Sequence, residues 1–219
     1  MALGILFDLD GTLLNSLEDL KATVNYTMSQ FGFAHRTLEE VRSFVGTGAR
    51  NLVRKSLPDG ADEKLVDDAL KIYQAYYAIH SCDNTAPYDG IMSALSGICA
   101  RYPVAIVSNK PDGAVKDLCK LYFPGVAAWG ESAALPRKPA PDMLYAAMRE
   151  LGVTQCIYVG DSETDIETAK NTNIPCLSVL WGFRDRQCLL SAGGKYFCDH
   201  PSELEKKIEE VVNKEFYGK

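Results

Sequence analysis

Four short and unbroken apolar runs constrain the possible folds of this chain most, and three of them end at polar residues. None of the runs alternates apolar with polar residues, so each fits a strand that is buried on both faces of a parallel sheet. Stretches of about helix length separate them. Alternating strands and helices indicate an α/β fold with a doubly wound, Rossmann-like, mostly parallel sheet. The runs cover residues 5–7, 104–107, 157–159 and 176–180.

Helices are predicted between and after these strands. Ser202 and Glu205 have the spacing of a capping box, so we expect a last helix to begin at Ser202. Its apolar face would carry Leu204, Ile208 and Val211. The earlier helical patterns cover residues 91–100, 111–122, 140–151 and 162–171.

The stretch from residue 16 to residue 84 interrupts this alternation, because it contains no convincing strand but several helical faces. One of its helices is expected to begin at Thr37, which has a capping-box partner in Glu40. We therefore expect residues 16–84 to form an α-helical cap, inserted into a core of residues 1–15 and 85–219. The two linkers would then lie side by side.

Composition excludes several classes of function. The 219 residues carry a formal net charge of -6 without any basic run, so neither nucleic acid nor an anionic membrane is an expected partner. No apolar stretch approaches the roughly 20 residues of a membrane helix. The seven cysteines contain no CxxC pair, which favours reduced, mostly buried thiols in a cytoplasmic protein. A monomer or a homodimer is compatible with this composition.

The residues that can carry chemistry follow the predicted strands. Asp8 and Asp10 come directly after the first run, Ser108 and Asn109 end the second, and the third is followed by a further acidic segment. In a doubly wound sheet, ligands bind beyond the carboxyl ends of the strands. We therefore expect one shared site, which would also contain Asp161, Asp165 and, from a loop that enters a helix, Lys138.

Such a group of carboxylates would be costly without a cation. At an effective dielectric of about 20, two like charges about 4 Å apart repel each other by roughly 4 kcal/mol. A purely structural role for Asp8, Asp10, Asp161 and Asp165 is therefore hard to justify. Oxygen ligands favour a hard ion, and Mg²⁺ usually takes one or two carboxylates together with substrate phosphate and waters.

Four motifs of this chain, in order, resemble those of the haloacid dehalogenase superfamily of phosphohydrolases. They are DLDGT at residues 8–12, the Ser108–Asn109 pair, Lys138 ahead of a Pro-x-Pro segment, and GDSETD at residues 160–165. Each motif alone is weak or moderate, whereas four in the right order at strand ends and helix starts are a strong signal. The resemblance covers the whole chain, including the helical cap.

The resemblance implies a role for each site residue. Asp8 would be the nucleophile that forms an aspartyl-phosphate, and Asp10 the acid that protonates the leaving group and then the base that activates water. Mg²⁺ would be held by Asp8, the Asp10 carbonyl and Asp161, with Asp165 nearby. Alternatively, Asp165 only caps or orients the following helix. The phosphoryl group would be bound by Thr12, Ser108, Asn109 and Lys138, although Ser108 and Asn109 could instead simply cap a helix.

Asp10 also narrows the reaction. Dehalogenases and phosphonate-cleaving members of the resembled superfamily lack an aspartate at this position. A halide leaves without a proton, whereas an alkoxide needs one. Asp10 therefore favours the cleavage of phosphate esters or the transfer of a phosphoryl group.

The cap resembles that of the phosphoglycolate phosphatase subgroup in residues 38–50, as does the later Trp-Gly-Phe-Arg segment at residues 181–184. Gly46 and Gly48 would let a cap loop approach the core closely. Arg50 or Arg54 could meet a substrate carboxylate, because a guanidinium matches a carboxylate in a fork geometry. The alternative for both arginines is a solvated helix face.

These patterns favour a small phosphorylated metabolite as substrate, with 2-phosphoglycolate first. Relatives with similar motifs act on sugar phosphates, nucleotides or pyrophosphate, so a pyrophosphatase or a nucleotidase stays possible. A phosphosugar mutase would use the same aspartyl-phosphate. A non-catalytic binding protein is a further alternative, although the presence of Asp8, Asp10, Lys138 and Asp161 argues against it.

Overall fold

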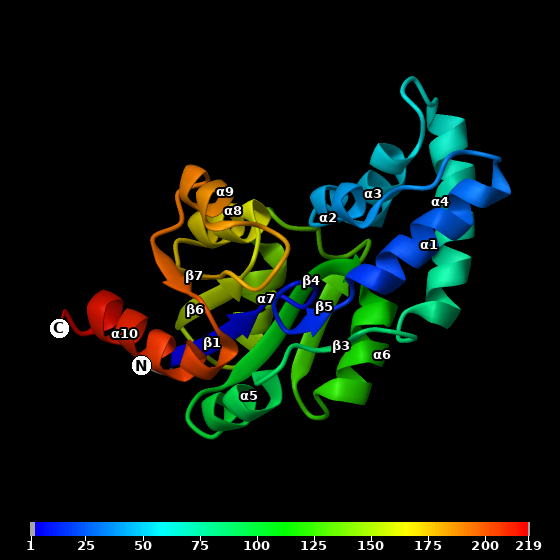
Figure 1. The fold of residues 1–219 in the computed structure, drawn as a ribbon. Helices are drawn as coiled ribbons and strands as arrows, with labels where there is room; N and C mark the ends of the chain where they lie inside the picture. Colours follow the sequence, from blue (N-terminus) through cyan, green and yellow to red (C-terminus); the bar gives the residue numbers. More distant parts are fainter. Residues whose placement is uncertain (1–2, 219) are drawn as a thin grey trace.

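A six-stranded, all-parallel sheet forms the centre of the larger part of the molecule (Figure 1). The computed structural model describes residues 3–218. The strand order is β5-β4-β1-β6-β7-β8, so the chain winds outward on one side of β1 and then returns to wind outward on the other. The predicted doubly wound sheet is confirmed. Its strands are β1 (Leu3–Phe7), β4 (Val104–Pro111), β5 (Ala127–Glu131), β6 (Gln155–Gly160), β7 (Cys176–Val179) and β8 (Tyr196–Cys198).

Helices cover both faces of this sheet, and this explains the unbroken apolar runs. Ile5 and Phe7 of β1 pack into the core on one face, while Leu6 packs into the core on the other. The first face is covered by α5 (Ile91–Cys99), α6 (Asp112–Tyr122) and α10 (Leu204–Phe216). The second is covered by α7 (Asp142–Glu150) and α8 (Glu163–Thr172). The short α9 (Arg186–Ser191) follows β7.

The start of α10 differs from the prediction. A 3₁₀ turn, η1 (Pro201–Glu203), precedes the helix, and the His200 side chain accepts the Ser202 N–H there. Ser202 therefore does not open a capping box. Glu205 instead pairs with Arg101, at 2.7 Å.

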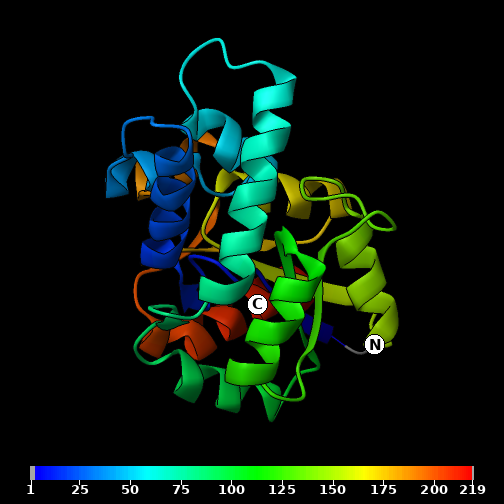
Figure 2. The same ribbon diagram turned by 90° about the vertical axis from the view of Figure 1, so that its right-hand side faces the viewer.

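Four helices form an insertion directly after β1 and lie together beyond one end of the sheet (Figure 2, blue to cyan). They have a hydrophobic core of their own, which includes Val24, Val41 and Val66. The predicted capping box of Thr37 and Glu40 is present. The helices are α1 (Leu17–Gln30), α2 (Leu38–Phe44), α3 (Ala49–Ser56) and α4 (Glu63–His80).

The two chain segments that connect this cap to the core run side by side. β2 (Leu14–Asn15) pairs with β3 (Ala86–Pro87) in an antiparallel ribbon. Beside it, the buried Asp19 carboxylate accepts hydrogen bonds from the backbone and side chains of Asn84 and Thr85, at 2.7–3.0 Å. The division of the chain at residues 16 and 84 stays a prediction, with this ribbon as its proposed hinge.

Two expectations from composition can be compared with the structure. Within residues 3–218, no helix combines the length and the apolar character needed to cross a membrane. All seven cysteines are free thiols. The expectation that most of them are buried is wrong, because only Cys119, Cys156 and Cys198 are buried, while Cys82 and Cys99 are exposed.

Candidate active site

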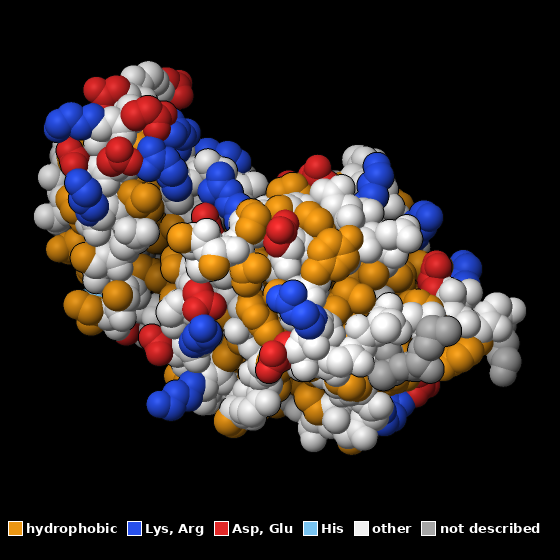
Figure 3. All heavy atoms as spheres, turned by 180° about the vertical axis from the view of Figure 1, so that it is seen from behind, with side chains coloured by type: hydrophobic (Ala, Val, Ile, Leu, Met, Phe, Trp, Pro, Cys, Tyr) orange, Lys and Arg blue, Asp and Glu red, His pale blue; other side chains and the backbone are white. Residues whose placement is uncertain are grey.

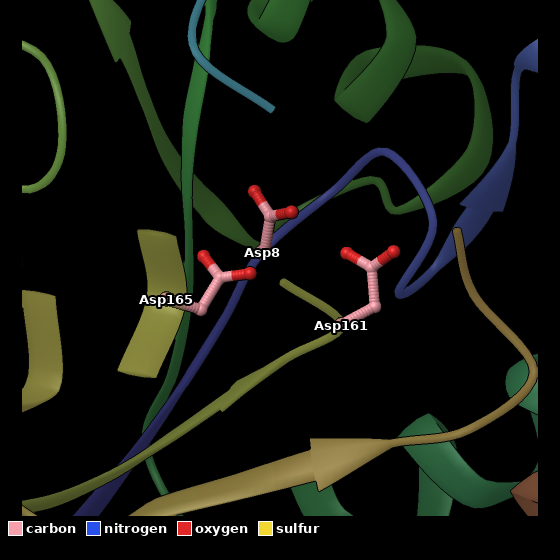
Figure 4. A group of neighbouring side chains, drawn as sticks. All are labelled: Asp8, Asp161 and Asp165. Carbon is pink, nitrogen blue, oxygen red and sulfur yellow. The ribbon is translucent and has the colours of Figure 1, made fainter. Parts of the chain in front are cut away.

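Three carboxylates meet at the carboxyl edge of the sheet, where the winding direction reverses. Asp8 follows β1, Asp161 follows its neighbour β6, and Asp165 lies in the first turn of α8. Figure 4 shows the three side chains gathered around one small space. All three are buried, and a carboxylate oxygen of each lies within 4.8 Å of the others. The crevice at this reversal is where doubly wound proteins bind ligands.

Lys138 lies among these acidic groups. Its Nζ donates to Asp8 Oδ1 at 2.7 Å, to Asp165 Oδ1 at 2.8 Å and to the Tyr158 hydroxyl at 2.8 Å. Burial alone would lower the pKa of Lys138, but Asp165 and Asp8 raise this pKa above its usual range. The lysine therefore stays positively charged beside Asp8, in position to bind an anionic group that approaches this carboxylate.

One ammonium does not balance the acidic groups. Burial raises the pKa of Asp8 to about 7, with Lys138 opposing and Asp165 adding to the rise. Burial also raises the pKa of Asp161 well above its usual range, and the neighbouring Asp165 and Asp8 add to this effect. No Lys or Arg among residues 3–218 forms an ion pair with Asp161. The all-oxygen donor set and its uncompensated charge fit a hard divalent cation.

The Asp165 carboxylate also accepts hydrogen bonds from two sets of donors, one on each oxygen. Its Oδ1 accepts from Lys138 and from Tyr158, while Oδ2 accepts the Ser162 hydroxyl at 2.6 Å and the Ser162 N–H at 3.1 Å. The Ser162 pair forms the capping box of α8. Asp165 thus has the helix-capping role that the sequence left open, while its carboxylate remains part of the cluster.

The Asp161 carboxylate occupies a space that is free only because two neighbouring residues are glycines. Its Oδ2 accepts the Phe183 N–H at 2.7 Å. A Cβ on Gly11 would lie 2.2 Å from this same Oδ2, and a Cβ on Gly182 would lie 2.4 Å from it. Gly11 also has a φ of +85°, which a residue with a side chain rarely adopts. These two glycines therefore fix where the Asp161 carboxylate can stand.

Asp10 has a partner that the sequence analysis missed. Its Oδ1 accepts from the Ser16 hydroxyl at 2.5 Å and from Lys110 Nζ at 2.6 Å. Lys110 is buried at the end of β4, directly after Asn109. The sequence does show a lysine directly after the Ser-Asn pair. A single lysine at a strand end is usually solvated, however, so this position alone did not indicate a contact with Asp10.

The four predicted phosphate ligands lie in different surroundings. Ser108 and Lys138 both line the cavity above Asp8. Asn109 also lines it, but its amide is engaged with the Lys138 backbone, accepting from N–H at 2.7 Å and donating to C=O at 3.0 Å. The Thr12 hydroxyl faces Asp161 at 3.5 Å. The side chains of Asn109 and Thr12 thus support Lys138 and Asp161 in this arrangement.

The cavity has a volume of about 260 Å³ and lies between the carboxylate cluster and the cap. Its core side includes Asp8, Asp10 and Lys110. The cap-side wall is largely apolar or aromatic and is formed by Leu20, Val45, Ala49, Leu52, Tyr73, Tyr77 and Ala78. The cavity is thus a partly open space of a size that suits a small ligand.

Arg50 and Arg54 do not line this cavity, so the expected contact with a substrate is not seen. Arg50 pairs with Asp67 and with Glu63 at 2.7 Å, and Arg54 pairs with Glu63 at 2.6 Å. Hydrogen bonds from Arg54 and Arg50 lower the pKa of Glu63 to about 2. Lys, Arg, Asp and Glu side chains mix on the tip of the cap (Figure 3). Acidic residues of α4 thus face these arginines across the cap surface.

The model of the family described as haloacid dehalogenase-like hydrolase matches residues 5–179, which covers most of the chain. The chain belongs to the haloacid dehalogenase-like hydrolases. The buried cluster of Asp8, Asp161 and Asp165 is consistent with a metal site of such a hydrolase.

Among similar proteins, several bacterial relatives are named phosphoglycolate phosphatase. The one from Colwellia psychrerythraea is 32% identical over 218 residues, which cover 91% of this chain and 94% of the relative. The one from Pseudomonas putida is 34% identical, covering 82% of this chain and 70% of the relative. A crystal structure of a phosphoglycolate phosphatase candidate from Lactobacillus delbrueckii subsp. bulgaricus is 33% identical, with a TM-score of 0.89 over 94% of this chain and 97% of that one. This hydrolase is therefore phosphoglycolate phosphatase-like.

In this haloacid dehalogenase-like hydrolase, the segment after β7 links the acidic cluster to the cap. Phe183 donates its N–H to Asp161, and its ring packs into the cap core. Arg184 pairs with Glu163 at 2.9 Å and donates to the carbonyls of Arg42 at 2.8 Å and Val45 at 2.7 Å. Arg184 thus pairs with a carboxylate of the core and also contacts the cap.

Tyr158 is a further residue that sequence reasoning missed. It lies in the middle of β6, within an apolar run, and is fully buried. Its hydroxyl contacts Lys138 and Asp165 and donates to the Val107 carbonyl at 3.1 Å. A tyrosine on a strand that is buried on both faces needs a partner for its hydroxyl. This requirement could have indicated from the sequence that Tyr158 contacts a polar group.

Proposed function

We propose that this hydrolase cleaves a small-metabolite phosphate monoester in a magnesium-dependent reaction that passes through an aspartyl-phosphate on Asp8. The favoured substrate is 2-phosphoglycolate. The observation that carries the proposal is the arrangement around Asp8. A buried carboxylate lies 2.7 Å from a buried ammonium, beside two further acidic groups and below a cavity that Asp10 also lines.

In the proposed reaction, an Asp8 oxygen attacks phosphorus and the bond from phosphorus to the leaving oxygen breaks. Asp10 gives its proton to that oxygen. Asp10 then takes a proton from water, which attacks the aspartyl-phosphate and releases inorganic phosphate while Asp8 is regenerated. Lys138 and Ser108 hold the phosphoryl oxygens through both steps.

Mg²⁺ would be held by Asp8 and Asp161, with the Asp10 carbonyl and Asp165 nearby, and would supply positive charge against the phosphoryl oxygens. This charge is needed because a carboxylate must approach a dianionic ester. Lys138 alone has two carboxylates beside it, so its charge is already offset. The uncompensated acidity of the cluster is the structural support for the metal.

Two observations support a compact substrate. The cavity lies between the core and the cap, and its volume of about 260 Å³ suits a small ligand. In addition, relatives that match most of the chain are named phosphoglycolate phosphatase. Among residues 3–218, three cationic side chains line the cavity. Lys110 and Lys138 do so from the core, and Arg184 does so near the cap.

The proposal is tested by measuring inorganic phosphate released from a panel of esters, with Mg²⁺ and with a chelator. The panel contains 2-phosphoglycolate, sugar phosphates, nucleotides and pyrophosphate. Asp8→Asn and Asp10→Asn are the control variants, because each keeps the shape of the site and removes a carboxylate.

The expected result is metal-dependent release that is highest with 2-phosphoglycolate and absent in Asp8→Asn. Asp10→Asn should release little phosphate from any alkyl ester, because it can neither protonate the leaving group nor activate water. Failure of every ester to release phosphate from the folded, Mg²⁺-loaded protein would contradict the proposal. A sugar bisphosphate converted without release of phosphate would point instead to a phosphosugar mutase.

A further inference from the structure

Lys110 contacts both Asp10, the proposed general acid, and the cap. Its Nζ lies 2.6 Å from Asp10 Oδ1 and 4.9 Å from the centre of the Tyr77 ring. Asp10 and Lys110 belong to the core, whereas Tyr77 belongs to α4 of the cap. The Lys110 side chain is only 3% exposed. A single buried ammonium therefore contacts a core carboxylate and a cap aromatic ring at once.

The contacts of Lys110 restrict the Asp10 carboxylate. Ser16 and Lys110 both donate to Oδ1, and no residue among 3–218 forms a hydrogen bond with Oδ2. Two donors on one oxygen fix the side chain rotation and leave the second oxygen for the proton that moves to the leaving group. Ser16 lies at the start of the cap insertion, so it contributes a second connection between Asp10 and that part of the chain.

The Tyr77 ring completes the surroundings of Lys110. A cation is attracted to the face of an aromatic ring, and the attraction increases when water is excluded. The Tyr77 ring reaches Lys110 only because α4 lies over the cavity. If the cap opened, the ammonium would lose this face and gain water, so its hold on Asp10 would weaken.

We propose that Lys110 is a positioning residue that holds Asp10 for proton transfer, and that the Tyr77 ring makes this hold dependent on cap closure. The inference rests on the proposed function, because it assigns Lys110 a part in the same reaction. Proton transfer to the leaving group is then available mainly in the closed form, when the substrate is shielded from water.

The test compares esters whose leaving groups differ in their need for a proton. The alkoxides of 2-phosphoglycolate and of glycerol phosphate need one, whereas the nitrophenolate of p-nitrophenyl phosphate does not. The variant is Lys110→Met, which keeps the length of the side chain and removes its charge. We measure kcat/KM with saturating Mg²⁺, because this ratio reports the first phosphoryl transfer.

Lys110→Met should lower kcat/KM by about 100-fold for both alkyl esters, as expected for the loss of a general acid, and leave it nearly unchanged for p-nitrophenyl phosphate. Asp10 also activates water in the second step. The variant should therefore release a burst of nitrophenolate before a slow steady state. Thermal unfolding and circular dichroism of the variant show whether it is folded.

The contribution of the cap is tested with a matched pair at Tyr77. Tyr77→Leu removes the ring face, and Tyr77→Phe keeps it. Tyr77→Leu should lower the ratio of kcat/KM for alkyl esters to that for p-nitrophenyl phosphate by about 10-fold. Tyr77→Phe should preserve this ratio. The pair also keeps the proposal testable if Lys110→Met does not fold.

Four results would overturn the inference. An equal loss on all three esters would mean that Lys110 only stabilises the fold. A loss confined to 2-phosphoglycolate would make Lys110 a contact for the substrate carboxylate. If the ratio of kcat/KM for alkyl esters to that for p-nitrophenyl phosphate is unchanged in Lys110→Met or in Tyr77→Leu, the substituted residue does not have the proposed role. A wild-type protein that hydrolyses none of the three esters would overturn the proposed function, and the positioning role with it.

Discussion

At the scale of single residues, the position of Asp161 depends on two neighbouring glycines that have no side chain. Gly182 has an ordinary backbone conformation, yet its Cβ position lies 2.4 Å from the Cβ and from Oδ2 of Asp161. The constraint is therefore steric and acts on a carboxylate that the proposed metal would need. Small displacements of such a ligand have large effects, because metal affinity depends on how surrounding groups orient the ligands.

Gly182→Ala should lower the affinity for Mg²⁺ by about 10-fold or more, because the added methyl group displaces Asp161. Isothermal titration calorimetry of the metal-free protein measures this affinity directly. The circular dichroism spectrum should stay unchanged, since the effect is confined to the site. An alanine variant that binds Mg²⁺ as tightly as the wild type would contradict this explanation.

Tyr158→Phe should reduce turnover by about 10-fold and lower the free energy of unfolding by about 1 kcal/mol or more. The reason is that the Tyr158 hydroxyl holds Lys138 and satisfies the Val107 carbonyl in a buried site. Steady-state kinetics and urea unfolding measure the two effects. The exposed Tyr145 offers a matched control, and Tyr145→Phe should change neither quantity. Equal behaviour of the two variants would count against the role of Tyr158.

The sequence placed Asp8, Asp10, Lys138 and Asp161 in one site, and the fold brings them together, because strand ends of a parallel sheet share an edge. Their roles stay predictions until they are measured. Tyr158 and Lys110 were missed because a pattern of residue types does not show which buried side chain reaches a charged group. Arg50 and Arg54 were considered either as substrate contacts or as a solvated helix face. Their pairing with acidic residues of α4 was not foreseen, because these partners are distant in sequence.

At the scale of elements, the proposed hinge is organised by one carboxylate. Asp19 lies in the first turn of α1 and accepts from four donors of Asn84 and Thr85. It thus ties the start of the cap to the segment that leaves it. Burial alone would raise the pKa of Asp19, but the hydrogen bonds from Thr85 and Asn84 outweigh this and hold the pKa below its usual 3.8.

Asp19→Asn should lower the free energy of unfolding by about 1–3 kcal/mol at neutral pH, because an amide cannot accept all of these bonds. A depressed pKa in the folded state stabilises the protein above the unfolded pKa, and this contribution is lost as the pH falls through the folded value. The difference between wild type and variant should therefore be constant above pH 3.8 and shrink below it. Urea unfolding across this range tests the sign. A difference that grows on acidification would be contrary to it.

The central strands and their helices were predictable, whereas the edge strands were not. The central runs are buried on both faces and are therefore apolar without interruption. β5 and β8 lie at the edges of the sheet and are only partly buried. β5 contains Gly130 and Glu131, and β8 has only three residues, so neither forms a clear apolar run. The start of α10 was mispredicted because His200, which the capping-box pattern ignores, caps a 3₁₀ turn.

At the scale of the whole molecule, separate contacts hold the cap against the core. Asn109 donates to the carbonyl of Gly46 at 3.1 Å. Arg184 reaches the carbonyls of Arg42 and Val45 while paired with Glu163. The close approach expected from Gly46 is thus present. Because the cavity lies between the cap and the core, opening of the cap would break these contacts.

Arg184→Met should shift the molecule toward an open form, because it removes hydrogen bonds from a charged group to cap carbonyls. A loss of about 2 kcal/mol corresponds to a roughly 30-fold increase in the ratio of open to closed molecules. Small-angle X-ray scattering should show a larger radius of gyration. Arg186→Met is the control, because Arg186 pairs with Asp199 and not with the cap. Identical scattering from the two variants would remove Arg184 from this role.

The insertion of the cap directly after β1 also sets an order of events during synthesis. Ile5 pairs with Val104 on one side and with Ile157 on the other, so β1 leaves the ribosome long before either neighbour exists. Helices α1 to α4 contact one another within residues 17–80 and can fold early, since contacts that are local in sequence form fast. A nascent chain that stops before β6 would hold a helical bundle beside an incompletely paired β1. Newly made molecules therefore acquire a cap before they acquire an active site.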